Sequence, residues 1–168
     1  LGATVILIPF STIRIEAAVQ NVNQGKEENI VSGESTADRL LIWDAAFEVG
    51  KYNFIAGTGT GDVKDKLIES YIKKGYCYPA EFKLNAHNQF IQSWVALGVS
   101  ACAALLLMLA IPAFASFRKK QFFYFSFLLI FGFNILVESM LEVQAGVIFY
   151  ALWNSTLWII LTRSEERR

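Results

Sequence analysis

Residues 84–117 read LNAHNQFIQSWVALGVSACAALLLMLAIPAFASF and contain no Asp, Glu, Lys or Arg. A helix needs about 20 mostly apolar residues to cross a hydrocarbon core of about 30 Å, so this stretch is long enough to span a membrane. Two further uncharged stretches follow, at 121–137 and 143–162, and 54% of the whole chain is apolar. The sequence therefore predicts an all-α membrane protein with C-terminal transmembrane helices at about 88–117, 121–140 and 143–162.

The charged residues give these helices a direction across the membrane. Residues 118–120 are all basic and lie between the first two helices, and Arg163, Arg167 and Arg168 follow the third. Short basic loops are retained in the cytoplasm, so both sites, including the C-terminal tail, are expected to be cytoplasmic. The turn at 138–142 and the polar loop at 10–86 then lie on the outer side. Residues 1–9 are expected to end another transmembrane helix, preceded by further helices outside this sequence.

The polar loop at 10–86 is itself expected to be mainly helical. An amphipathic helix is predicted from about Ser35 to Gly50, because it opens with the spacing of a capping box and has apolar residues at helical intervals. A glycine-rich turn at 57–61 follows, and a second short helix runs from Asp62 to about Lys74. The glycine turn fits a tight turn that needs positive φ, although the amides at the start of the following helix could also contact an anion.

His87 is the only histidine, and it lies where the polar loop meets the first uncharged stretch. If the helix includes it, His87 shares a stripe with Ile91, Trp94 and Gly98 and faces the helix bundle. Only an imidazole titrates unaided near neutral pH, which makes His87 a candidate general acid or base. The alternative is an imidazole that only forms hydrogen bonds at the membrane interface.

Arg39 lies in the first turn of the predicted loop helix, where the helix dipole disfavours a cation by about 0.3–1 kcal/mol. Its planar guanidinium suits a diphosphate, and the alternative is an ion pair with Asp38 or Asp44. Arg14 is a second candidate for the same role, unless it only extends toward the membrane surface. Glu138 and its neighbour Glu142 lie near the expected depth of His87, where they could orient the imidazole or belong to a hydrated turn.

These motifs together resemble the C-terminal part of the O-antigen ligase family, from about Ser35 to Phe149. The resemblance is carried by Arg39-Leu40-Leu41-Ile42-Trp43, by Gly57 to Asp62 followed by Tyr71, by His87-Asn88 with Gly98, by Glu138-Ser139-Met140-Leu141-Glu142 and by Gln144-Ala145-Gly146. Two positions depart from the family pattern. Ala101 stands where Gly, Thr or Tyr is common, and Val143 stands where a basic residue is expected.

The resemblance implies a GT-C-like polytopic architecture in a bacterial inner membrane, with the active loop in the periplasm. It implies transfer of a glycan from an undecaprenyl-diphosphate carrier to a sugar hydroxyl of the lipid A core, with no cofactor and no metal. His87 and Arg39 would be catalytic. The substrate-binding residues that it implies are Arg14, Trp43, Asn88, Gly59, Gly61 and Glu138.

Other functions fit the same residues. An O-antigen polymerase or a protein O-oligosaccharyltransferase has this architecture and differs in its acceptor. A non-catalytic scaffold or transporter fragment would use His87 and Arg39 only structurally. The expected partners are a lipid-linked glycan, a glycan acceptor and membrane lipid. Because the formal net charge is zero, nothing indicates a nucleic-acid partner.

Overall fold

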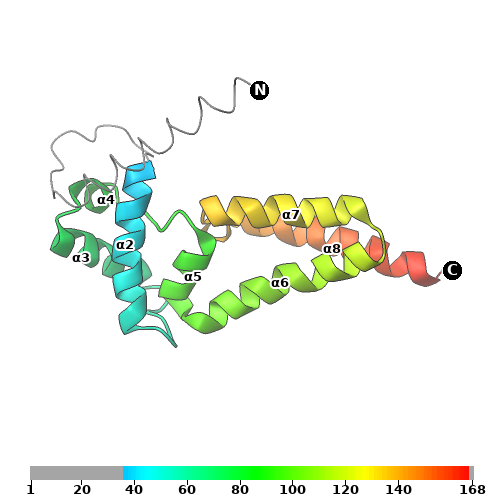
Figure 1. Ribbon diagram of the computed structural model, residues 1–168, viewed down its shortest axis with the longest axis horizontal. Coiled ribbons are helices and arrows are strands. Elements are labelled where there is room, and N and C mark those ends of the chain that lie inside the picture. The colour runs from blue at the N-terminus through cyan, green and yellow to red at the C-terminus, as the bar shows by residue number, and fades with distance from the viewer. Residues whose placement is uncertain (1–35, 167–168) are drawn as a thin grey trace, which may run out of the picture.

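The computed structural model describes residues 36–166, which form helices and contain no strand. The elements are α2 (Thr36–Tyr52), α3 (Val63–Lys74), α4 (Cys77–Glu81), α5 (Gln89–Leu97), α6 (Val99–Arg118), α7 (Phe122–Val137), the 3-10 turn η1 (Met140–Glu142) and α8 (Gln144–Glu166). Helices α2, α3 and α4 gather at one end, α6, α7 and α8 extend away from them, and α5 connects the two parts (Figure 1). Arg14, the helix end predicted at 1–9 and the first part of the loop lie outside the described residues.

The first part is a small helical unit with its own apolar core. Ile42 and Ala45 of α2 are buried against Leu67 and Tyr71 of α3 and against Val95 of α5. Burial of one large aliphatic side chain contributes about 1.5–3 kcal/mol, so this cluster fixes α5 relative to α2. Residues of α5 therefore hold a set position relative to the loop helices.

Exposed ion pairs join α2 and α3. Lys74 Nζ lies 2.6 Å from Asp44 Oδ2 and 3.0 Å from Glu48 Oε2, and Lys73 Nζ lies 2.8 Å from Glu48 Oε1. Burial works to raise the pKa of Asp44, but hydrogen bonds from Lys74 and Tyr76 outweigh it, and the pKa falls below its ordinary value. Hydrogen bonds from Lys73 and Lys74 likewise lower the pKa of Glu48.

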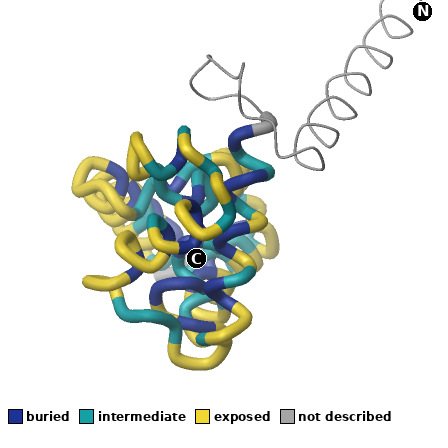
Figure 2. The backbone as a smooth tube through the Cα atoms, turned by 90° about the vertical axis from the view of Figure 1, so that its left-hand side faces the viewer, coloured by how far each residue is buried: buried dark blue, intermediate teal, exposed yellow. Residues whose placement is uncertain are grey.

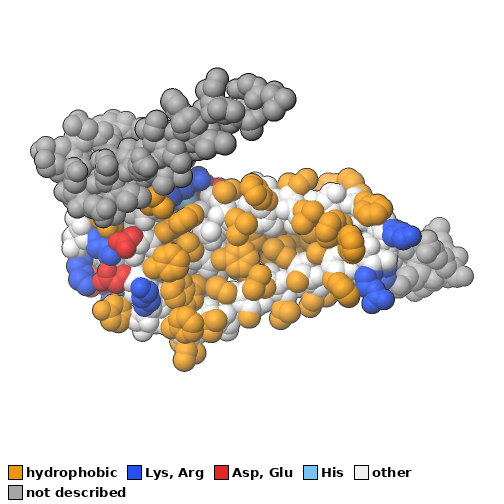
Figure 3. All heavy atoms as spheres, in the orientation of Figure 1, with side chains coloured by type: hydrophobic (Ala, Val, Ile, Leu, Met, Phe, Trp, Pro, Cys, Tyr) orange, Lys and Arg blue, Asp and Glu red, His pale blue; other side chains and the backbone are white. Residues whose placement is uncertain are grey.

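Helices α6, α7 and α8 form an elongated bundle with apolar outer faces. Its core contains Tyr124, Leu128 and Phe131 of α7 and Tyr150 and Leu157 of α8. Helices α6 and α8 are long and apolar enough to cross a membrane, yet only 17% and 22% of their apolar spans are buried. Apolar side chains cover the bundle between charged groups at its two ends (Figure 3). In the view from the α2–α4 end, exposed segments lie around the outside and buried ones toward the centre (Figure 2). An uncovered apolar surface of this kind marks a face that contacts lipid or other apolar helices, in agreement with the membrane protein that the sequence predicts.

The single helix predicted at about 88–117 is wrong, because the chain breaks into α5 and α6 at Gly98. Gly98 has φ 76°, and a Cβ at this position would collide with the backbone carbonyl of Ile55. The Val99 N–H donates to Phe54 O at 3.1 Å, so the loop after α2 supplies an acceptor to the start of α6. His87 also lies two residues before α5 and does not share a helical stripe with Ile91 and Trp94.

The other two apolar helices start close to their predicted positions but end elsewhere. Helix α7 ends at Val137 instead of 140, because Glu138 is extended, with φ −143° and ψ 148°. The chain then turns through η1 into α8, which continues to Glu166. The early end of α7 directs Glu138 back toward the segment that precedes α5.

Candidate active site

The backbone around His87 is held in an uncommon conformation. His87 has φ 44°, in the left-handed region that costs a non-glycine residue about 1–3 kcal/mol. The preceding residue, Ala86, is fully buried; its N–H donates to Gln92 Oε1 at 3.0 Å, and its carbonyl accepts from Trp43 Nε1 at 2.9 Å. The His87 N–H donates to Asn85 Oδ1 at 3.0 Å. These contacts fix both sides of Ala86 and so maintain the strained conformation of His87.

Three amide side chains attach the start of α5 to the turn between α7 and α8. Asn88 Oδ1 accepts from the N–H groups of Phe90 and Ile91, which caps α5, and Asn88 Nδ2 donates to Leu136 O at 2.8 Å. Gln89 Oε1 accepts from the Leu141 N–H at 2.7 Å. Gln92 Oε1 accepts from the Ala86 N–H, and Gln92 Nε2 also donates to Glu142 Oε2 at 3.5 Å. Gln89 and Gln92 are only 3% exposed, so their side chains form these bonds largely away from water, whereas the Asn88 bond to Leu136 is exposed.

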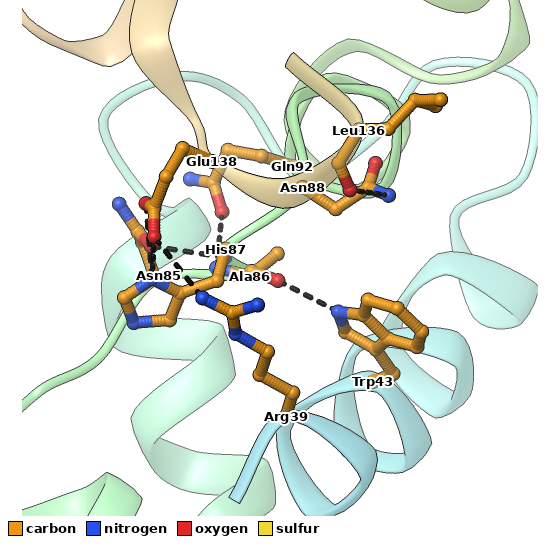
Figure 4. A network of polar contacts seen from close by, with 9 residues as sticks. All are labelled: Arg39, Trp43, Asn85, Ala86, His87, Asn88, Gln92, Leu136 and Glu138. Atoms are coloured by element: carbon orange, nitrogen blue, oxygen red, sulfur yellow. Dashed lines mark hydrogen bonds and ion pairs between the residues drawn. The ribbon is translucent and has the colours of Figure 1, made fainter. Parts of the chain in front are cut away.

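Glu138 lies between His87 and Arg39 and contacts both (Figure 4). His87 Nδ1 is 3.1 Å from Glu138 Oε2 and 3.3 Å from Oε1, and Arg39 Nη2 is 3.4 Å from Oε1. A strong charge-assisted N–H···O bond is about 2.7–2.9 Å long, so both contacts are longer than that, and the arginine contact is the longest. The carboxylate thus contacts the imidazole through both oxygens and the guanidinium through one.

Arg39 and Trp43 approach this site from successive turns of α2. Trp43 donates to Ala86 O, whereas Arg39 extends past it to Glu138. Asp44, considered above as a partner for Arg39, instead accepts from Lys74 at 2.6 Å and from Tyr76 at 2.8 Å. The contact that the structure gives Arg39 is thus to a residue 99 positions away in the chain.

A cleft of about 560 Å³ adjoins the imidazole. Its lining includes His87, Gln92, Gly61, Glu142, Lys64 and Lys83. Both lysines are exposed, and within the described residues neither forms an ion pair. In residues 36–166 no group of three His, Cys, Asp or Glu side chains gathers to hold a metal ion. The ionisable groups that line the cleft are thus one imidazole, two ammonium groups and one carboxylate.

The glycine turn packs against the end of α5. The Thr58 N–H donates to Val95 O and the Gly59 N–H donates to Ala96 O, each at 2.8 Å. Gly57 has φ 71° and Gly59 has φ 95°, which agrees with the expected tight turn. The Thr58 and Gly59 amides therefore bind the carbonyl end of α5, whereas Gly61, which precedes the next helix, lies at the cleft.

Comparison with known protein families matches residues 1–106 to the family described as O-antigen ligase. The chain belongs to the O-antigen ligase family. Membership implies a membrane glycosyltransferase of the O-antigen ligase or polymerase type, with a lipid-linked glycan as its substrate. No curated protein and no solved structure matches this O-antigen ligase family member.

The family assignment inferred from the motifs is confirmed, and the structure brings several of its residues together. His87, Arg39 and Glu138 form one network, and the functional roles expected for them remain predictions. Trp43 and Asn88 bind backbone carbonyls beside this network. Four residues that support or line the site were not predicted from the sequence: Gln89, Gln92, Lys64 and Lys83. Two glutamines at positions i and i+3 of an otherwise apolar helix were the available signal.

Proposed function

We propose that this O-antigen ligase family member transfers a glycan from undecaprenyl diphosphate to a sugar hydroxyl of the lipid A core at the periplasmic face of the inner membrane. The observation that carries the proposal is the Glu138 carboxylate, which joins the sole histidine of the chain to Arg39 beside a cleft. A base and a cation held together suit a reaction in which a hydroxyl loses a proton while a diphosphate leaves.

His87 is the general base in this proposal. With Nδ1 donating to Glu138, Nε2 carries the free lone pair and accepts the proton of the acceptor hydroxyl. The hydroxyl oxygen bonds to the anomeric carbon, the bond between that carbon and the phosphate oxygen breaks, and its electron pair stays on the diphosphate. Glu138 stabilises the imidazolium that results, so no unpaired charge forms in the site.

Arg39 receives the departing diphosphate. Its contact with Glu138 is 3.4 Å long and its side chain is one-third exposed, so the guanidinium can turn toward a stronger anion at small cost. Lys64 and Lys83 add positive charge along the cleft and support the same assignment. The proposed reaction uses no nucleotide and no metal, as the family resemblance implies.

The direct test is transfer by purified His87→Ala protein from an undecaprenyl-diphosphate glycan to lipid A-core. Loss of a positioned base should lower the rate by about 10²-fold or more, while insertion and accumulation in the membrane are unchanged. Glu69→Gln is the control, because Glu69 is exposed on α3 and pairs with Lys66 of the same helix. Near-normal transfer by the His87→Ala protein would refute the proposed base.

The acceptor is tested in cells that lack the protein. Unattached lipid-linked glycan carrying many repeats is the expected result for a ligase. Accumulation of single-repeat glycan on lipid A-core would instead assign the chain to polymerisation, and loss of glycan from proteins alone would assign it to protein glycosylation.

A further inference from the structure

The end of α2 and the loop after it expose large apolar side chains to the surroundings. Tyr52 is 82% exposed, Phe54 53% and Ile55 77%, and Leu97 and Val99 at the α5–α6 junction are also exposed. Single exposed apolar residues are common in soluble proteins, but adjacent ones mark a surface with a partner. We refer to these five residues as the junction patch.

The length of α6 places the junction patch at the membrane surface. Helix α6 has 20 residues, and at about 1.5 Å per residue it just crosses a hydrocarbon core of about 30 Å. The span is therefore complete only if its outer end lies near Val99. Phe54 O accepts the Val99 N–H, and the Ile55 carbonyl lies against Gly98, so the loop is fixed at that same depth.

The side chains around the patch have the chemistry of a membrane interface. Trp94 packs between Phe47 and Phe54, with ring centroids 5.6 Å and 5.9 Å away. Lys51 is exposed beside them in the last turn of α2. Aromatic rings with a neighbouring lysine are enriched where the acyl chains meet the headgroups, because each group has its preferred solvent there.

We propose that the junction patch inserts into the headgroup–acyl boundary of the leaflet in which α6 begins, and so attaches the α2–α4 unit to the membrane surface. Its occupant is lipid, because the patch is continuous with the apolar face of α6. Helix α5 spans nine residues, about 13 Å, and leads from the patch to His87, so the anchored loop also sets the distance of the cleft from the bilayer. This inference holds whether or not the chain transfers a glycan.

The test measures the depth of a spin label in vesicles of phosphatidylethanolamine and phosphatidylglycerol. The native cysteines are first replaced as Cys77→Ser and Cys102→Ala, and a label is attached at Ile55→Cys. The control label is at Ile72→Cys, because Ile72 is 67% exposed near the end of α3 that lies away from the bundle (Figure 1). Both positions are exposed, so neither label should prevent folding.

The label at 55 is expected to collide more with oxygen than with a water-soluble nickel chelate, at a depth near the headgroups, whereas the label at 72 shows the reverse. A label at 55 that collides mainly with the nickel chelate would overturn the proposal. A label at 55 that neither reagent reaches would overturn it as well, because protein would then cover the patch. A second label at Tyr52→Cys must give the same answer as the first.

Discussion

Replacement of Glu138 by glutamine tests whether this carboxylate acts through His87. The glutamine keeps the size and one acceptor oxygen but removes the charge that stabilises an imidazolium. The His87 side chain is 19% exposed and that of Glu138 is 47% exposed, so their contact is neither fully exposed nor fully shielded. The free energy of the contact should therefore lie between about 1 kcal/mol, for an exposed ion pair, and about 3 kcal/mol, for a shielded hydrogen bond to a charged group.

That range corresponds to a rate loss of roughly 5- to 150-fold in the Glu138→Gln protein, with little change in Tm. The assay is a double-mutant cycle of initial transfer rates with wild-type protein, His87→Ala, Glu138→Gln and the double variant. If Glu138 acts through His87, the Glu138→Gln substitution lowers the transfer rate by a much smaller factor in the His87→Ala protein than in the wild-type protein. The same factor in both backgrounds, or no loss in the single variant, would refute the reasoning.

Further outcomes follow from the same structure. Arg39→Lys should keep part of the activity, because lysine retains the charge but not the planar guanidinium. Arg39→Ala should lose nearly all of the activity and also donor binding. Unchanged donor affinity in the Arg39→Ala protein would contradict the proposed contact with the diphosphate. A cysteine at Lys73 should react with an impermeant reagent from outside and one at Lys119 should not, and labelling at 119 in intact spheroplasts would reverse the predicted topology. The hydrogen bond from Lys74 lowers the pKa of Asp44 in the folded protein. The ionised Asp44 therefore stabilises the fold at pH values above its ordinary pKa of about 4, and this stabilisation is lost as the pH falls through the lowered pKa of the folded state. Asp44→Asn should therefore lower Tm at pH 7 by an amount worth no more than about 1 kcal/mol, and this difference should shrink as the pH falls below the ordinary pKa of Asp; a difference that stays the same in acid would contradict the assignment.

Local pattern was enough to predict most of the helices. Uncharged runs, basic turns and a glycine turn each act over a few residues, so the positions of α2, α3, α7 and α8 could be anticipated to within a few residues. The break in the helix at Gly98 could not be predicted in this way. It depends on the carbonyl of Ile55, which lies 43 positions away in the chain. In the sequence alone, a glycine within an apolar run equally suits a continuous helix that packs closely against another.

The candidate site shows the same division between local and distant signals. His87 and Arg39 stood out because each is an unusual residue for its local position. Glu138 contacts both of them, but it lies 51 positions from His87 and 99 positions from Arg39 in the chain. A local sequence pattern does not predict contacts over such separations. Gln89 was overlooked because an uncharged amide reads as ordinary polar sequence until its burial is known.

The role proposed for Glu138 sets a minimum length for an active fragment. The region matched to the family ends at residue 106, within α6, and so contains the imidazole and the guanidinium but not the carboxylate that couples them. A chain cut there would keep the region that the family model matches and lose the carboxylate that contacts both His87 and Arg39. Recombinant fragments, chimaeras and inactive homologues should therefore be judged by whether the turn after α7 is present.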